Sequence, residues 1–153
     1  MSEPFKSPYP PLNLPSAPLR LRKKGDKVFV FDIVRKDWFV LTPEEWVRQH
    51  FIHFLVFKSY PMSLIAVEKQ IFYNKQQKRF DLVVFSRKHK PLIVIECKAS
   101  VVRLDESVFQ QAAMYAHSLQ VPYLCITNGV HTLCWRIENP ILYFSELPDF
   151  SEL

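Results

Sequence analysis

The sequence is poor in cysteine and lacks several signals that would assign it to other classes of protein. Its three cysteines, Cys97, Cys125 and Cys134, show neither a CxxC pair nor a Cys/His spacing typical of zinc, so neither a disulfide framework nor a zinc site is indicated. No apolar run reaches the ~18 residues of a membrane span, and no basic segment followed by an apolar one opens the chain. We therefore expect a cytoplasmic protein without membrane association.

A nucleotide-binding GxxxxGK[ST] motif, internal repeats and low-complexity blocks are also missing, so no ATPase motor is expected in this chain. The 153 residues are 48% hydrophobic, which is enough for the core of a single domain. We assign that domain to residues 19–153 and residues 1–18, which contain six prolines, to an extended arm. The net charge of +5 favours a polyanionic partner.

The domain begins with short alternating runs from residue 19 to residue 41, which predict a small β-meander with turns at Gly25-Asp26 and Arg35-Lys36. Its basic residues are typical of a solvated strand edge that resists aggregation. A helix should follow, with Thr42 as N-cap, Pro43 at its first position and Glu45 completing a capping box. Pro61 ends it, and residues 63–74 are expected to form the next strand.

Residues 79–99 contain two apolar runs joined by a basic tetrad, residues 87–90, and therefore predict a β-hairpin. If Ser86 faces Pro91, paired positions sum to 177 and Asp81 lies opposite Glu96. Opposed carboxylates only ~5 Å apart destabilise a sheet unless something compensates. Lys98 lies on the same face as Glu96, and the carboxylate pair also suits a hard cation such as Mg²⁺.

A second helix is expected from residue 104 to residue 119, with Asp105 as its cap. Gln111 and Tyr115 are four residues apart and therefore share one face of this helix. Residues 121–127 and 130–137 should form two strands around the turn Asn128-Gly129. The resulting order is helix, three strands, helix, strand.

Asp81-x14-Glu96-x-Lys98 in a hairpin, followed by Gln111-x3-Tyr115 on a helix, resembles the PD-(D/E)XK nuclease superfamily. Within that superfamily it resembles the N-terminal nuclease domain of type I restriction enzyme R subunits. The resemblance implies an α/β (α+β) fold with a restriction-endonuclease-like core, in which helices flank a central mixed sheet in the order α-β-β-β-α-β. The N-terminal β-meander would precede this core.

The resemblance also implies a metal-dependent deoxyribonuclease that uses Mg²⁺ or Mn²⁺. Asp81, Glu96 and the carbonyl of Cys97 would be metal ligands, and Glu45 is the best match for the glutamate that the first helix contributes in this family. Lys98 would orient water or stabilise charge on the phosphate, and Gln111 and Tyr115 would position the phosphate or Lys98. Glu44 or Glu68 remains an alternative third acid, and Glu68 and Gln70 are candidate supporting residues.

DNA is the expected partner, and Lys75, Lys78 and Arg79 are the better candidates for phosphate contacts because the basic tetrad lies at the far end of the hairpin. Other restriction subunits or a separate motor protein would supply functions that this chain lacks. Two alternatives stay open. The chain could be an inactive nucleic-acid-binding module acting through a partner, or an interaction domain unrelated to nucleic acid.

Overall fold

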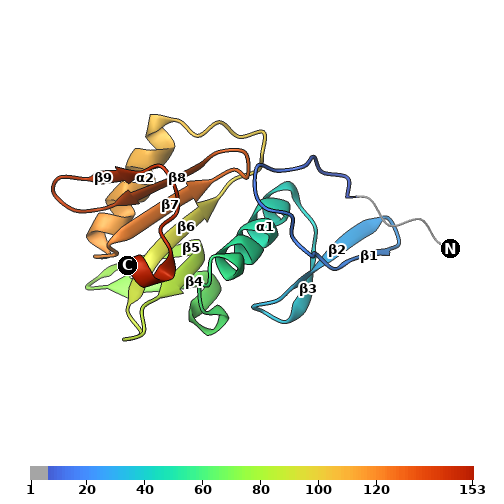
Figure 1. Ribbon diagram of the computed structural model, residues 1–153, viewed down its shortest axis with the longest axis horizontal. Helices are drawn as coiled ribbons and strands as arrows, with labels where there is room; N and C mark the ends of the chain where they lie inside the picture. The colour runs from blue at the N-terminus through green and yellow to red at the C-terminus, as the bar shows by residue number, and fades with distance from the viewer. Residues whose placement is uncertain (1–6) are drawn as a thin grey trace.

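A computed structural model describes residues 7–153, so Pro4 of the predicted arm lies outside the described residues. The main unit is a six-stranded sheet in the order β4-β5-β6-β7-β8-β9, with helices α1 and α2 packed on it (Figure 1). β6 and β7 are parallel and the other neighbours are antiparallel, so the sheet is mixed, as predicted. The strands are β4 (Ile65–Tyr73), β5 (Gln76–Phe85), β6 (Pro91–Cys97), β7 (Tyr123–Thr127), β8 (Thr132–Arg136) and β9 (Leu142–Phe144).

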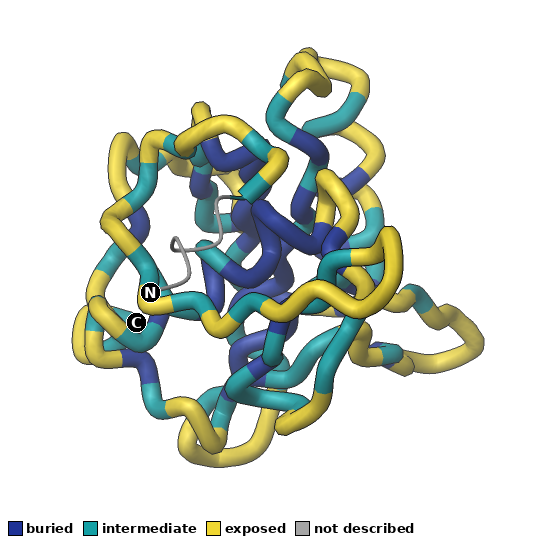
Figure 2. The backbone as a smooth tube through the Cα atoms, turned by 90° about the vertical axis from the view of Figure 1, so that its right-hand side faces the viewer, coloured by how far each residue is buried: buried dark blue, intermediate teal, exposed yellow. Residues whose placement is uncertain are grey.

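The helices cover opposite faces of this sheet because successive strand residues point to opposite sides. Leu82 and Ile95 face one cluster, where they pack with Phe51 of α1 (Pro43–Phe57). Val83 faces the other cluster, which contains Ala113 of α2 (Glu106–Ser118). Figure 2 shows the buried segments at the centre of the molecule, enclosed by exposed turns. The predicted α-β-β-β-α-β core is therefore confirmed as a three-layer arrangement.

The predicted meander is a separate three-stranded sheet made of β1 (Leu21–Lys24), β2 (Lys27–Asp32) and β3 (Asp37–Val40). Gly25 and Lys36 have φ values of 66° and 56° in its two turns, at the positions where the sequence predicts reversals. The face bearing Leu21 and Val30 packs beside Trp46 of α1. The meander is thus anchored to the main unit through one face.

α1 begins where predicted, and α2 begins at Glu106, two residues after the predicted start and directly after its predicted cap Asp105. α1 lacks half of its expected capping box. The Thr42 hydroxyl accepts a hydrogen bond from the Glu45 N–H at 3.0 Å, and Asp105 caps α2 in the same way through Val108. The Glu45 carboxylate does not return to the Thr42 N–H, because it accepts hydrogen bonds from arginine and glutamine side chains instead. The two short 3₁₀ helices span Met62–Leu64 and Phe150–Glu152.

The predicted register of the β5–β6 hairpin is confirmed for the three pairs that adjoin Asp81 and Glu96. Leu82 pairs with Ile95 and Val84 with Ile93, so paired positions sum to 177. A register shift after Val84 makes Phe85, not Ser86, the partner of Pro91; the predicted Ser86–Pro91 pairing is therefore wrong. A bulge of this kind absorbs one residue without changing the pairing beyond it.

The described part of the arm, residues 7–18, contains no helix or strand. Asn13 donates its backbone N–H to the Gly129 carbonyl at 2.8 Å, and the Trp46 indole donates to the Pro10 carbonyl at 3.0 Å. The arm therefore bridges the β7–β8 turn and α1. Within residues 7–153, neither α-helix has the length and apolar composition needed to cross a membrane.

Candidate active site

The hairpin register brings Asp81, in the middle of β5, next to Glu96, near the C-terminal end of β6. The Asp81 Oδ2 atom accepts a hydrogen bond from the Cys97 N–H at 2.8 Å, which ties β5 to the residue directly after Glu96. The Cys97 side chain is buried in the core beneath α1. Asp81 and Glu96 therefore lie beside Cys97, whose backbone carbonyl is the predicted metal ligand and whose thiol is buried in the core.

Glu96 is held in an environment that disfavours its charge. Its side chain is only 14% exposed; burial and the neighbouring Asp81 raise its pKa to about 6, against the opposing charges of Lys78 and Lys98. The Oε1 atom has no hydrogen-bond donor among the described residues, and the Lys78 ammonium is 3.7 Å away. A buried carboxylate oxygen without a donor is costly, so this atom is suited to a cation.

The remaining predicted residues, Lys98, Tyr115 and Gln111, differ in how close they lie to the Asp81–Glu96 pair. Lys98 is half-buried and close enough to Glu96 to lower the pKa of that carboxyl. The Lys78 ammonium lies 5.4 Å from the ring centre of Tyr115, which connects α2 to the site. Gln111, one turn earlier on α2, is exposed. Lys78 was predicted only as a phosphate contact, but it lies within the site, between Glu96 and Tyr115.

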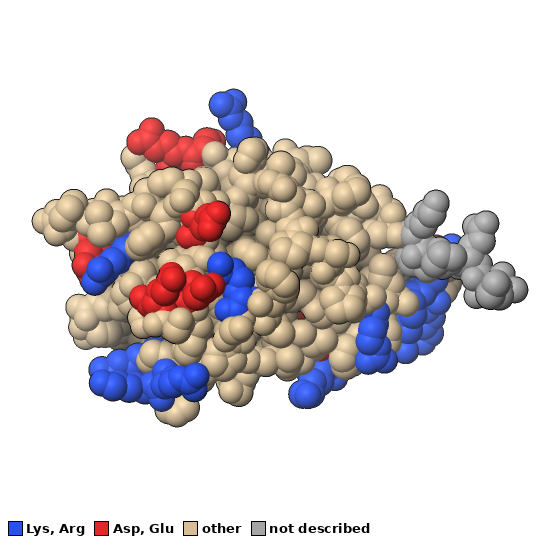
Figure 3. All heavy atoms as spheres, viewed as in Figure 1, with Lys and Arg blue, Asp and Glu red and all other residues tan. Residues whose placement is uncertain are grey.

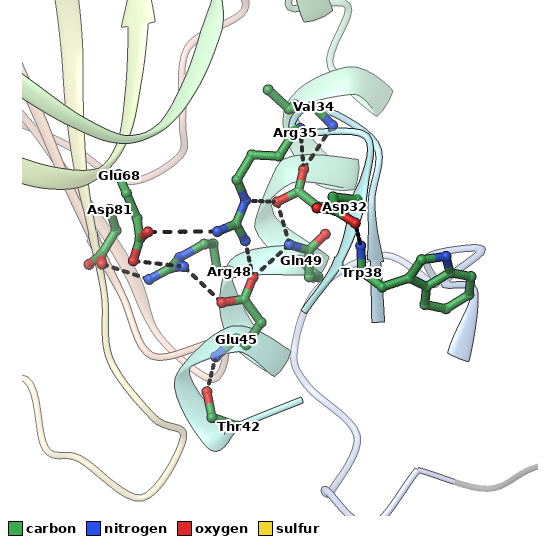
Figure 4. Close-up of polar contacts among 11 residues, drawn as sticks. Asp32, Val34, Arg35, Trp38, Thr42, Glu45, Arg48, Gln49, Glu68 and Asp81 are labelled. Atoms are coloured by element: carbon green, nitrogen blue, oxygen red, sulfur yellow. Dashed lines mark hydrogen bonds and ion pairs between the residues drawn. The ribbon is translucent and has the colours of Figure 1, made fainter. Parts of the chain in front are cut away.

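An ion-pair cluster that the sequence did not predict adjoins Asp81 (Figure 4). Arg48 of α1 contacts Glu45 at 2.7 Å, Asp81 at 3.0 Å and Glu68 of β4 at 3.6 Å. Burial lowers the pKa of Arg48, but the charges of Glu45 and Asp81 outweigh it and raise that pKa above its usual value. Arg48 is thus a fixed cation that links the first helix to Asp81 of the hairpin.

The meander contributes a second arginine to this cluster. Arg35, in the β2–β3 turn, contacts Glu45 at 2.6 Å and Glu68 at 3.7 Å. Its position is set by Asp32, which accepts hydrogen bonds from the backbone N–H and the side chain of Arg35, each at 2.8 Å, and another from Gln49. Burial raises the pKa of Asp32, but these hydrogen bonds outweigh it and hold that pKa below its usual value.

Among the candidate third acids, Glu45 and Glu68 lie in this cluster, whereas Glu44 is exposed on α1. Both oxygens of Glu45 are already engaged by Arg35, Gln49 and Arg48. The role of Glu45 as a metal ligand therefore stays a prediction. One signal for the cluster was present in the sequence: Glu45 and Arg48 are three residues apart, a spacing that places them on one helical face.

The donors at the hairpin are of the type that Mg²⁺ prefers. No group of three or more His, Cys, Asp or Glu side chains within residues 7–153 is arranged to hold a metal ion. Asp81 and Glu96 with the Cys97 carbonyl would instead supply two carboxylates and one backbone oxygen, and Mg²⁺ commonly takes one or two carboxylates. Each Asp81 oxygen already accepts one hydrogen bond and keeps capacity for another. The residues present fit a divalent cation.

The raised pKa of Glu96 leads us to predict how the stability of the metal-free protein depends on pH. A folded-state pKa of about 6 against an ordinary value of 4.5 means that the folded protein binds this proton more tightly than the unfolded chain. Stability contributed by protonated Glu96 is therefore full below pH 4.5 and lost as pH rises through 6. Glu96→Gln should be about 2 kcal/mol more stable than wild type at pH 7.5.

Urea unfolding in EDTA between pH 4.5 and 7.5 measures this difference. Glu44→Gln is the matched control, because Glu44 is exposed and its neutralisation should leave the difference near zero. A constant gap between Glu96→Gln and wild type across this pH range would contradict the raised pKa.

Comparison with known proteins gives one family and one structure. Residues 43–150 match the family described as type I restriction enzyme R protein N terminus. A solved fragment attributed to the HsdR subunit of a type I restriction enzyme from Vibrio vulnificus YJ016 has 24% sequence identity and a TM-score of 0.44, over 58% of this chain and 19% of that fragment. No curated protein has a matching sequence. Because the family match spans more than half of the sequence, this chain belongs to the type I restriction enzyme R protein N-terminal family.

Proposed function

We propose that this chain is a metal-dependent DNA endonuclease domain of the type I restriction R-subunit kind, which hydrolyses phosphodiester bonds. The observation that carries the proposal is the Asp81–Glu96 pair, with a buried Glu96 oxygen that lacks a hydrogen-bond donor. The Lys78 ammonium lies 3.7 Å from this oxygen, an ion pair without a hydrogen bond, and therefore leaves the oxygen available to a divalent cation. Family membership supports the restriction context.

In this proposal Asp81, Glu96 and the Cys97 carbonyl would hold Mg²⁺ or Mn²⁺, with Glu45 or Glu68 as a further acid. When bound, the cation polarises a phosphate oxygen of the substrate. Lys98 donates to the attacking water or to the phosphate oxygen that gains charge. Lys78, beside both Glu96 and Tyr115, can hold the neighbouring phosphate, and Gln111 can contact the substrate from the exposed face of α2.

Other components would complete the biological function. These 153 residues lack a GxxxxGK[ST] motif, so ATP-driven movement along DNA would require a motor domain outside them, and another restriction subunit or a separate motor protein is a candidate source. A non-catalytic DNA-binding module is the second candidate. It is favoured by Arg48, which already contacts the Asp81 Oδ1 atom at 3.0 Å and neutralises part of the acidic pair without any metal.

The test is cleavage of linear, supercoiled and single-stranded DNA with Mg²⁺ or Mn²⁺ by wild type and Lys98→Ala. We expect wild type to cleave at least one form and Lys98→Ala to be at least about 100-fold slower, because a positioned charge at the reacting phosphate is lost. Lys90→Ala, in the exposed β5–β6 loop, is the control and should cleave as wild type. A well-folded wild type that cleaves no form with either metal would favour the binding module.

A further inference from the structure

The meander has an outer face that differs from the face buried against α1. Strand alternation turns Val30 and Asp32 inward, where both are buried, and turns the residues between them outward. The outer face is formed by Arg20 just before β1, Arg22 and Lys24 of β1, Lys27, Phe29 and Phe31 of β2, and Trp38 and Val40 of β3. On this outer face, the basic side chains of the β1 edge therefore lie beside half-buried aromatic side chains of β2 and β3.

The aromatic residues of this outer face do not belong to the protein core. Within residues 7–153, Phe29, Phe31 and Trp38 pack into none of the three hydrophobic clusters. The outer face of an antiparallel sheet is usually polar, so three aromatic rings there call for another role. Their contacts with the arginines supply it.

Two arginines of the outer face lie over these aromatic rings. The Arg20 guanidinium lies 4.4 Å from the ring centre of Phe31, and that of Arg22 lies 4.3 Å from the ring centre of Trp38. A guanidinium stacked on a ring keeps the N–H groups at its edge free to donate and is pre-organised for a phosphate. The aromatic rings therefore act as supports for fixed cations.

The charge of this segment is strongly one-sided. Residues 20–27 contain five basic residues and one acidic residue, and Lys and Arg side chains gather over β1 and β2 in Figure 3. Within residues 7–153, Arg20, Arg22, Lys24 and Lys27 form no ion pair. The meander also lies before residues 43–150, which match the family. This surface therefore lies outside the matched residues and carries unneutralised positive charge.

We propose that the outer face of the meander binds the phosphate backbone of DNA, independently of sequence. The choice of DNA as the polyanion rests on the proposed function. Arg20, Arg22, Lys24 and Lys27 would contact successive phosphates, with Phe31 and Trp38 supporting the arginines. Arg35, in the β2–β3 turn of the same sheet, pairs with Glu45 and Glu68 beside the candidate site. The meander that would bind DNA is therefore attached to that site.

The experiment measures binding of a fluorescent DNA duplex by anisotropy in EDTA over a series of salt concentrations. The triple variant Arg22→Gln, Lys24→Gln, Lys27→Gln should bind at least about 10-fold more weakly and lower the salt slope by roughly 2 to 3, since each duplex phosphate contact contributes about 0.9. The matched control is Arg87→Gln, Lys88→Gln, Lys90→Gln, which removes the same charge from the exposed β5–β6 loop. It should bind within about twofold of wild type.

A third variant separates fixed geometry from charge. Trp38→Leu changes no charge but removes the support beneath Arg22, and should weaken binding by about fivefold. Equal losses in the two triple variants, or no loss in the meander variant, would overturn the inference. The binding assay contains no metal, so its result does not depend on cleavage. If wild type binds DNA through the meander but never cleaves it, only the proposed nuclease function is overturned. If wild type cleaves DNA but the meander variant binds it as wild type does, only this inference is overturned.

Discussion

Replacing Arg48 with methionine should lower the free energy of unfolding by about 3 to 5 kcal/mol, the cost of breaking a buried ion pair by removing one partner. The Arg48 side chain is only 7% exposed and contacts Glu45, Asp81 and Glu68. Methionine fills much of the same volume but leaves the buried Glu45 carboxylate with Arg35 as its only charged partner among the described residues. Urea unfolding measures the loss as a lower midpoint at unchanged slope.

Two further variants show whether the loss comes from this cluster. Arg136→Met removes an arginine that pairs with Glu138 at 2.9 Å but is 42% exposed, so its effect should stay below about 1 kcal/mol. Arg48→Lys should restore only part of the stability, because a single ammonium cannot bridge several carboxylates as a guanidinium does. Equal midpoints for Arg48→Met and Arg136→Met would contradict the structural role of Arg48.

Replacing Asp81 with asparagine should slow DNA cleavage by roughly 1000-fold, or about 4 kcal/mol of transition-state stabilisation, if the proposed function holds. Asparagine keeps an oxygen that can accept the Cys97 N–H, which Asp81 binds at 2.8 Å. It removes the negative charge that would hold a divalent cation between Asp81 and Glu96. The rate is measured on the best DNA form under single-turnover conditions, and calorimetry with Mn²⁺ tests metal binding without cleavage.

The matched control for this change is Asp149→Asn. Asp149 is also paired with a basic side chain, that of Lys58 at 3.1 Å, but is 57% exposed and lies far along the chain, in the C-terminal segment. Its neutralisation should leave the rate within about twofold of wild type. An Asp81→Asn protein that keeps more than a tenth of the wild-type rate would argue against Asp81 as a metal ligand.

The sequence predicted those parts of the fold that depend on local pattern. The two apolar runs within residues 79–99 and the basic tetrad between them were enough to pair Leu82 with Ile95, because the length of the loop sets the register of a hairpin. The caps Thr42 and Asp105 were also predictable, because a cap forms hydrogen bonds only with the first turn of its own helix. The bulge after Val84 was not, because neighbouring strands can absorb one residue in several places.

The ion-pair cluster was not predicted because its members come from four separate elements. Arg35 belongs to a turn, Arg48 to a buried helix and Glu68 to the edge strand β4. A charged residue is ordinary at each of these places, so none of them indicated a contact with the others. Glu68 also departs from regular strand geometry, with φ of 52°, so alternation along β4 could not place its side chain. The site residues themselves came from a resemblance, and their chemical roles stay predictions until cleavage and metal binding are measured.

The attachment of the β2–β3 turn bears on which segment can fold as an independent unit. The family match begins at Pro43, yet Asp32 and Arg35 reach across that boundary to Gln49 and Glu45. A truncated chain that began at the first residue of α1 would leave Glu45 buried with fewer partners and expose the apolar surface of Trp46 that Val30 covers. Residues 43–150, which match the family, are therefore only part of the folding unit, and the meander is an integral part of this domain.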